Sequence, residues 1–233
     1  MVDYTNFETY LFLSPKKFII LVIRETNEKI YENEILLDAK SKDLDLDKLD
    51  HFLNDNIFKI EKFLNDFVKN IHLIIDCEFF FSVNMSIKKN NYGELLTTSN
   101  INYVLNEAKH YCSDTLSNRK LIHLLIDNYL IDGKSYSNFP QNLKCNYFSL
   151  DINFICLPLN YVRKIEDTIN KYQISLNRLI SMKYIENYFS SENLPLNEMA
   201  QKIIDGYNLN EVVLTSKKVK NKSFFEKFFH FFN

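Results

Sequence analysis

The chain has 233 residues, 46% of them hydrophobic and 25% charged, which is typical of a globular protein with a buried core. Its formal net charge of −2 gives no overall attraction to nucleic acid, so we expect no nucleic-acid partner. Only three residues are glycine, and Gly93, Gly133 and Gly206 lie far apart. Phosphate-binding loops need clustered glycines, so the sequence excludes a P-loop and a GxGxxG turn, and we predict no cofactor and no enzymatic activity.

The first third of the chain predicts three strands, one long helix and a fourth strand. Apolar runs at 10–13 and 18–24, separated by a turn containing Pro15, predict a strand pair, and a third strand follows. A broad apolar stripe at helical spacing then predicts a helix whose N-terminus is preceded by aspartates, as the helix dipole favours. The third strand, the helix and the fourth strand are expected at 29–37, 46–70 and 71–76.

The middle of the chain predicts a strand, a helix and two further strands. Ser99 or Asn100 is the expected N-cap of the helix, and Asp132-Gly133 is the expected turn between the later strands. These elements are expected at 79–88, 101–111, 120–131 and 147–157. Asn160 then predicts the cap of another helix, followed by a strand at 174–182 and a short helix at 184–189.

The cysteines and acidic residues do not predict a metal site. Cys77, Cys112, Cys145 and Cys156 lack the paired spacing of a zinc site, and we expect buried, reduced thiols. The acidic segment 43–54 lacks the glycine and glutamate that a calcium loop requires. A nucleophilic pair of Cys112 with His123 stays open at this point.

The C-terminal residues predict an amphipathic helix that binds the membrane surface. Stepping 100° per residue from Phe224 places six phenylalanines within an arc of about 160°, with lysines beside and before them. Such a helix lies well in a membrane interface that contains anionic lipid, although docking on the protein's own core or on a second copy stays open. The predicted membrane-binding residues are Phe224, Phe225, Phe228, Phe229, Phe231, Phe232, Lys217, Lys218, Lys220, Lys222 and Lys227.

Residues 29–189 resemble FtsA, the actin-like cell-division family of bacteria. The best stretch is RKLIHLLIDNYLIDG at 119–133, which is similar to the FtsA segment in which an "IH" strand runs into a "Y.IDG" turn. The helix before it, SNINYVLNEAKHY, and the passage from Tyr147 to Phe189 are also similar, and the tail looks like the family's membrane-targeting helix. No Asp or Gly stands at Phe12 to Lys16, where FtsA has its first phosphate turn, and its other glycine turns have no counterpart.

The resemblance implies an α+β fold: a partial actin-like (ribonuclease H-like) lobe with an inserted strand–helix–strand–strand subdomain. The second actin-like lobe, which in the family contributes to the nucleotide site and receives the FtsZ tail, has no counterpart in the sequence. The expected units are the first part of the lobe (1–78), the subdomain (79–158), the return to the lobe (159–192), a weakly structured linker (193–222) and the membrane-targeting helix (223–233).

We therefore expect an adaptor of the divisome at the cytoplasmic side of the inner membrane, at midcell. It would bind anionic lipid and another division protein, with FtsZ and a late division protein as candidates and self-association open. A diverged actin-like ATPase and a pilus-assembly adaptor of the PilM kind are the alternatives.

Overall fold

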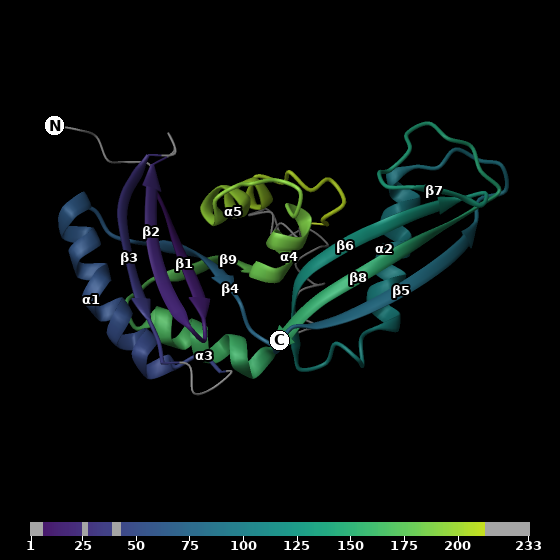
Figure 1. Cartoon of the computed structure of the whole chain (residues 1–233). Coiled ribbons are helices and arrows are strands. Elements are labelled where there is room, and N and C mark those ends of the chain that lie inside the picture. Colours follow the sequence, from purple (N-terminus) through teal and green to yellow (C-terminus); the bar gives the residue numbers. More distant parts are fainter. Residues whose placement is uncertain (1–6, 25–27, 39–42, 213–233) are drawn as a thin grey trace, which may run out of the picture.

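The computed structural model describes residues 7–24, 28–38 and 43–212. These residues form two β-sheets with five helices packed against them (Figure 1). The predicted α+β class is therefore confirmed.

The first sheet has the strand order β3-β2-β1-β4-β9. β1, β2 and β3 pair antiparallel, whereas β4 runs parallel to β1 and β9 runs parallel to β4. This order with these directions is that of a ribonuclease H-like sheet, the framework of an actin-like lobe, as the sequence predicted. The strands are β1 (Phe7–Ser14), β2 (Lys17–Arg24), β3 (Lys29–Leu36), β4 (Asn70–Ile75) and β9 (Ser175–Ser181).

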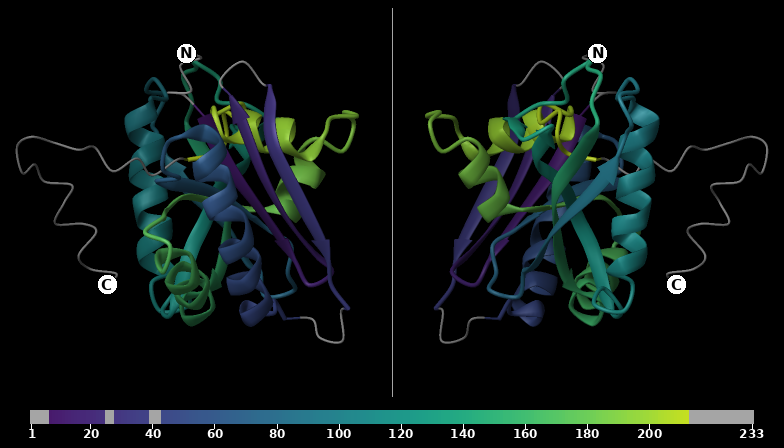
Figure 2. Two further views of the ribbon diagram at one scale, coloured as in Figure 1. Left: turned by 90° about the vertical axis from the view of Figure 1, so that its left-hand side faces the viewer. Right: turned by 90° about the vertical axis from the view of Figure 1, so that its right-hand side faces the viewer.

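Helices cover both faces of the first sheet, which explains why β1 and β2 are continuous apolar runs rather than alternating ones. α1 (Leu46–Leu64) and α3 (Leu159–Asn170) share one core with the sheet. α4 (Met182–Tyr188) and α5 (Leu196–Ile204) share another core on the opposite face. Figure 2 shows strands β1 to β3 between α1 on one side and α4 and α5 on the other.

The second sheet is inserted between β4 and α3 and has the order β5-β8-β6-β7, with every pair antiparallel. α2 (Thr98–Tyr111) packs on one face of this sheet, and the edge strand β5 alternates between core and outward-facing residues. Its strands are β5 (Phe81–Asn90), β6 (Arg119–Ile131), β7 (Lys134–Tyr136) and β8 (Tyr147–Pro158).

Two helix boundaries differ from the prediction because of capping. α1 ends at Leu64 rather than at 70, since Asn65 takes the left-handed conformation and turns the chain toward β4. α2 begins at Thr98, and Thr97 is its N-cap, with the Asn100 side chain accepting the reciprocal hydrogen bond from the Thr97 N–H.

The predicted capping role of Asn160 is also wrong. α3 begins at Leu159 directly after Pro158, which ends β8 and offers no side-chain cap. The Leu159 N–H instead donates to the carbonyl oxygen of Asn118 at 2.9 Å, so the start of α3 is fixed by the chain entering β6.

The segment 193–222, predicted as a weakly structured linker, is structured as far as Val212. Ala200 and Ile203 of α5 are buried against the first sheet. Further along, the Ile126 N–H donates to the Asn210 carbonyl and the Val212 N–H donates to the Leu124 carbonyl, at 2.9 and 2.8 Å. The chain thus returns from the lobe and pairs with β6 of the second sheet.

Candidate interaction surface

The predicted membrane-binding residues lie outside the described residues, which end at Val212. They are Phe224, Phe225, Phe228, Phe229, Phe231, Phe232, Lys217, Lys218, Lys220, Lys222 and Lys227, and their role stays a prediction. Within the described ranges, no helix is long and apolar enough to cross a bilayer.

The last described residues are held in place by a buried carboxylate, Glu211. Its side chain is only 4% exposed and accepts three side-chain hydrogen bonds. Nδ1 of His123 on β6 lies 2.8 Å from Oε1, a guanidinium nitrogen of Arg178 on β9 lies 2.7 Å from the same oxygen, and the Tyr184 hydroxyl on α4 lies 3.0 Å from Oε2. Glu211 therefore joins both sheets to the end of the described part of the chain.

The hydrogen bonds define the protonation state of this cluster. Nε2 of His123 accepts the backbone N–H of Ser181 at 3.0 Å, so the ring proton is on Nδ1 and is donated to Glu211. Burial lowers the pKa of His123, which keeps the imidazole neutral. Burial by itself would raise the pKa of Glu211, but the His123 hydrogen bond and the Arg178 charge outweigh it and lower that pKa.

This arrangement does not support a nucleophilic pair of Cys112 and His123, which the sequence left undecided. Both ring nitrogens of His123 are already bonded, to Glu211 and to Ser181. Burial raises the pKa of the Cys112 thiol, which disfavours the reactive thiolate.

The described cysteines are all free thiols, as predicted. Cys112, Cys145 and Cys156 are buried, whereas Cys77 is half-buried. Across 7–24, 28–38 and 43–212, no three His, Cys, Asp or Glu side chains gather closely enough to hold a metal ion.

The turn after β1 is closed by its own side chain. Oγ of Ser14 accepts the backbone N–H groups of Lys16 and Lys17 at 3.3 and 3.1 Å, and the hydroxyl donates to the Lys17 carbonyl oxygen. The backbone N–H groups of Lys16 and Lys17 are therefore already bonded within the turn.

Two exposed tyrosines lie on the outer side of α2, next to β5. We call this region the α2–β5 surface and define it by Lys89, Tyr103, Glu107 and Tyr111. The helical residues are spaced by four and so share one face of α2. Tyr103 is 63% exposed and Tyr111 62% exposed. Exposed tyrosines beside charged groups are typical of protein interfaces.

An ion pair fixes the centre of the α2–β5 surface. Nζ of Lys89 lies 2.6 Å from Glu107 Oε2, and the Tyr111 hydroxyl donates to Glu107 Oε1 at 2.9 Å. The hydrogen bond from Lys89 holds the pKa of Glu107 below its usual range, and the same bond raises the pKa of Lys89. The charges are thus matched within the surface, which leaves the tyrosine rings as its main outward-facing groups.

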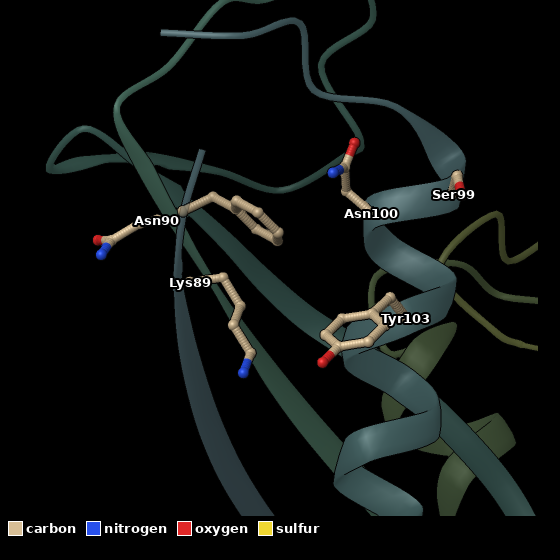
Figure 3. A pocket seen from close by; sticks show the side chains of 6 residues that line it. Lys89, Asn90, Ser99, Asn100 and Tyr103 are labelled. Carbon is tan, nitrogen blue, oxygen red and sulfur yellow. The ribbon is translucent and has the colours of Figure 1, made fainter. Parts of the chain in front are cut away.

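A pocket of about 280 Å³ opens at the N-terminal end of this surface, between β5 and α2 (Figure 3). Figure 3 shows the Tyr103 ring and the Lys89 side chain extending toward one another from the two elements, and Nζ lies 5.6 Å from the ring centroid. Asn100 on the rim is already used in capping α2. Lys89 of the pocket lining is likewise paired, with Glu107.

No known family model matches the chain, and no curated protein matches it. Two solved structures are similar to it in fold. One is a type IV pilus biogenesis complex, PilM–PilN, with 6% identity and a TM-score of 0.46 over 78% of this chain. The other is a Bacteroides thetaiotaomicron protein of unknown function with an actin-like ATPase fold, with 14% identity and a TM-score of 0.35 over 83% of this chain.

The chain spans 49% of the first structure's chain and 61% of the second's. The strand order and directions of the first sheet are those of a ribonuclease H-like sheet, and a second sheet is inserted between β4 and α3.

Proposed function

We propose that this protein is an FtsA-like adaptor of cell division, held at the cytoplasmic face of the inner membrane and binding another division protein. One observation carries the proposal: Glu211 and Val212 are fixed to both sheets, and the basic and phenylalanine-rich segment begins at Lys217, five positions later. A membrane-bound segment at that place would hold both sheets close to the lipid.

The membrane role rests on the physical character of residues 217–232. Six phenylalanines on one helical face would bury apolar area in the interface, and each nearby lysine adds about 1 kcal/mol of attraction to an anionic leaflet.

The adaptor role rests on the α2–β5 surface. Tyr103 and Tyr111 present exposed rings on the inserted sheet, which in the FtsA-like reading is the subdomain that binds other division proteins. FtsZ and a late division protein are the candidate partners. The closed Ser14 turn and the absence of clustered glycines support an adaptor that works without ATP.

Vesicle flotation with the full chain tests the membrane role. We expect the protein to float with vesicles that contain phosphatidylglycerol, and the double variant Phe228→Asp plus Phe231→Asp to stay at the bottom. The matched control is Phe58→Asp plus Phe67→Asp, which changes two phenylalanines of the body that are each 70% exposed. Flotation that survives the tail variant, or is lost equally in the control, would reject the proposed anchor.

A fluorescent fusion tests the cellular role. We expect midcell localisation that becomes diffuse in the tail variant. A fusion that stays on the membrane in that variant, or that never gathers at midcell, would count against a division adaptor.

Two alternative functions each rest on one specific observation. A pilus-assembly adaptor is favoured by the similarity to the PilM–PilN complex, and it would co-purify with pilus proteins rather than with FtsZ. A diverged actin-like ATPase is favoured by the fold alone and would show ATP affinity in a thermal-shift assay.

A further inference from the structure

A second pocket, of about 470 Å³, lies where the inserted sheet joins the lobe. Figure 1 shows β6 and β8 converging there beside the start of α3. Two arginines line it from different elements, Arg119 at the start of β6 and Arg163 in the first turns of α3. Asn118 and Asn160 add side-chain amides to the same wall.

Neither arginine has a carboxylate partner among the described residues. Glu166, one turn beyond Arg163 on α3, is instead paired with Lys120 at 2.5 Å, and no ion pair joins Arg163 to Asp167. The Arg119 guanidinium lies 4.3 Å from the ring centroid of Phe81, a contact that positions the group without neutralising it. Two arginines thus border the pocket, and neither forms an ion pair with a carboxylate of the described residues; Arg163 is exposed to solvent.

The N-terminus of α3 adds the partial positive charge of its backbone N–H groups to that of the two arginines. Pro158 provides no side-chain cap, and within the described part of the chain the N–H of Asn160 has no acceptor. The Leu159 N–H is tied to Asn118, which fixes this end of the helix against the chain entering β6. A helix N-terminus adds to the attraction for an anion that the arginines create.

We propose that this junction pocket binds a phosphate group. A planar carboxylate is satisfied by a single guanidinium, whereas a tetrahedral phosphate accepts from two guanidinium groups on separate elements and from a helix N-terminus together. The phosphate belongs either to a soluble phosphate compound or to a lipid headgroup, and bound there it would link the inserted sheet to the lobe.

Titration with inorganic phosphate at constant ionic strength tests the site, read by calorimetry. The full chain carrying Phe228→Asp plus Phe231→Asp is used, so that the result does not depend on the proposed membrane tail. We expect saturable binding, weakened about tenfold by Arg163→Gln, the loss of one charged hydrogen-bond donor. Lys164→Gln is the matched control: it removes the same charge one residue later, at an exposed position outside the pocket lining.

Acetate binding and flotation with lipid vesicles are then compared with the binding of phosphate. Acetate binding as tight as that of phosphate, equal weakening by Lys164→Gln, or no saturable phosphate binding would each overturn the proposal. Vesicles containing phosphatidic acid then separate the sources: flotation that depends on Arg163 indicates a lipid headgroup, and phosphate binding without such flotation indicates a soluble compound.

Discussion

The two sheets of this protein are built for different environments. The first is covered by helices on both faces, so β1 and β2 are apolar along almost their whole length. The second has one covering helix, and β5 alternates, with Ser82, Asn84 and Ser86 facing outward. The first sheet is therefore a framework, whereas the second leaves a polar face, the edge strand β5 and the tyrosines of α2 exposed.

The returning segment near the end of the described chain links these two regions in addition to the insertion itself. The segment 210–212 pairs with β6, while Glu211 bonds to Arg178 of β9 and Tyr184 of α4. The two sheets thus share a buried electrostatic clamp, which we define as Glu211 with His123, Arg178 and Tyr184. In the sequence it comes just before the predicted membrane segment. From the contrast between the two sheets we expect mutations to lower the free energy of unfolding by different amounts in the first sheet, the clamp, the turns and the exposed surface.

The largest expected effect is in the framework. Phe18 on β2 is fully buried and packs against Phe52 of α1, with ring centroids 6.1 Å apart. Phe18→Ala should lower the free energy of unfolding by about 3 to 5 kcal/mol in urea titrations, because a cavity remains. Phe81→Ala on β5 is the matched change in the second sheet, at a residue 37% exposed, and should cost about 1 kcal/mol or less. Equal costs would contradict the contrast between the two sheets.

The next effect is at the clamp. Glu211→Gln removes the charge that pairs with Arg178 and leaves that guanidinium partly buried, so we expect a loss of about 2 to 4 kcal/mol. Glu186→Gln is the control, since it is the same change at an exposed position of α4. A loss at Glu211 no greater than at Glu186 would show that the clamp does not hold the body together.

The clamp also predicts how stability changes with pH. The folded-state pKa of His123 lies below its ordinary value of 6.5, so the unfolded chain takes up this proton first and stability falls as the pH drops below 6.5. The folded-state pKa of Glu211 lies below 4.5, so its contribution is complete above pH 4.5 and is lost as the pH falls through the folded pKa. Urea titrations from pH 7 to well below pH 4.5 should show both steps, and Glu211→Gln should remove the lower one.

A smaller effect is expected at the hairpin of the second sheet. Asp132 and Gly133 form the two-residue turn between β6 and β7, both with positive φ, and the Asp132 carboxylate accepts the backbone N–H groups of Asn146 and Tyr147. Gly133→Ala should cost about 1 to 2 kcal/mol from backbone strain alone, because no atom closer than 3.7 Å opposes the added carbon. Gly133→Asn, which tolerates this conformation better, should recover part of the loss in thermal unfolding.

The sequence predicts the strands and helices well because their signals are local. The Asp132-Gly133 turn, the apolar runs of β1 and β2 and the helical stripe of α1 each lie within a few turns of chain. The Thr97 cap was missed although its signal, a threonine three residues before Asn100, is also local.

The clamp and the junction pocket were missed because their residues meet only in the folded chain. His123 and Glu211 are 88 positions apart, and Arg119 and Arg163 lie on separate elements. No local signal marks Glu211, because it follows a mixed polar and apolar stretch, Asn208-Leu209-Asn210. The partner itself could not be read from spacing, since it depends on β9 passing beneath the returning chain.

The smallest effect on stability, and the largest on association, is expected at the α2–β5 surface. Tyr103→Ser plus Tyr111→Ser removes two mostly exposed rings and should change the free energy of unfolding by about 0.5 kcal/mol or less per site. If this surface receives a partner, the same variant should lose midcell localisation yet still float with anionic vesicles, because the proposed membrane segment is unchanged. Tyr207→Ser plus Leu209→Ser is the control, since it removes two exposed apolar side chains near the clamp instead. If the α2 variant kept its midcell localisation, the partner site would have to lie in another part of the molecule. The exposed polar face of β5 and β8 would then be the next surface to mutate.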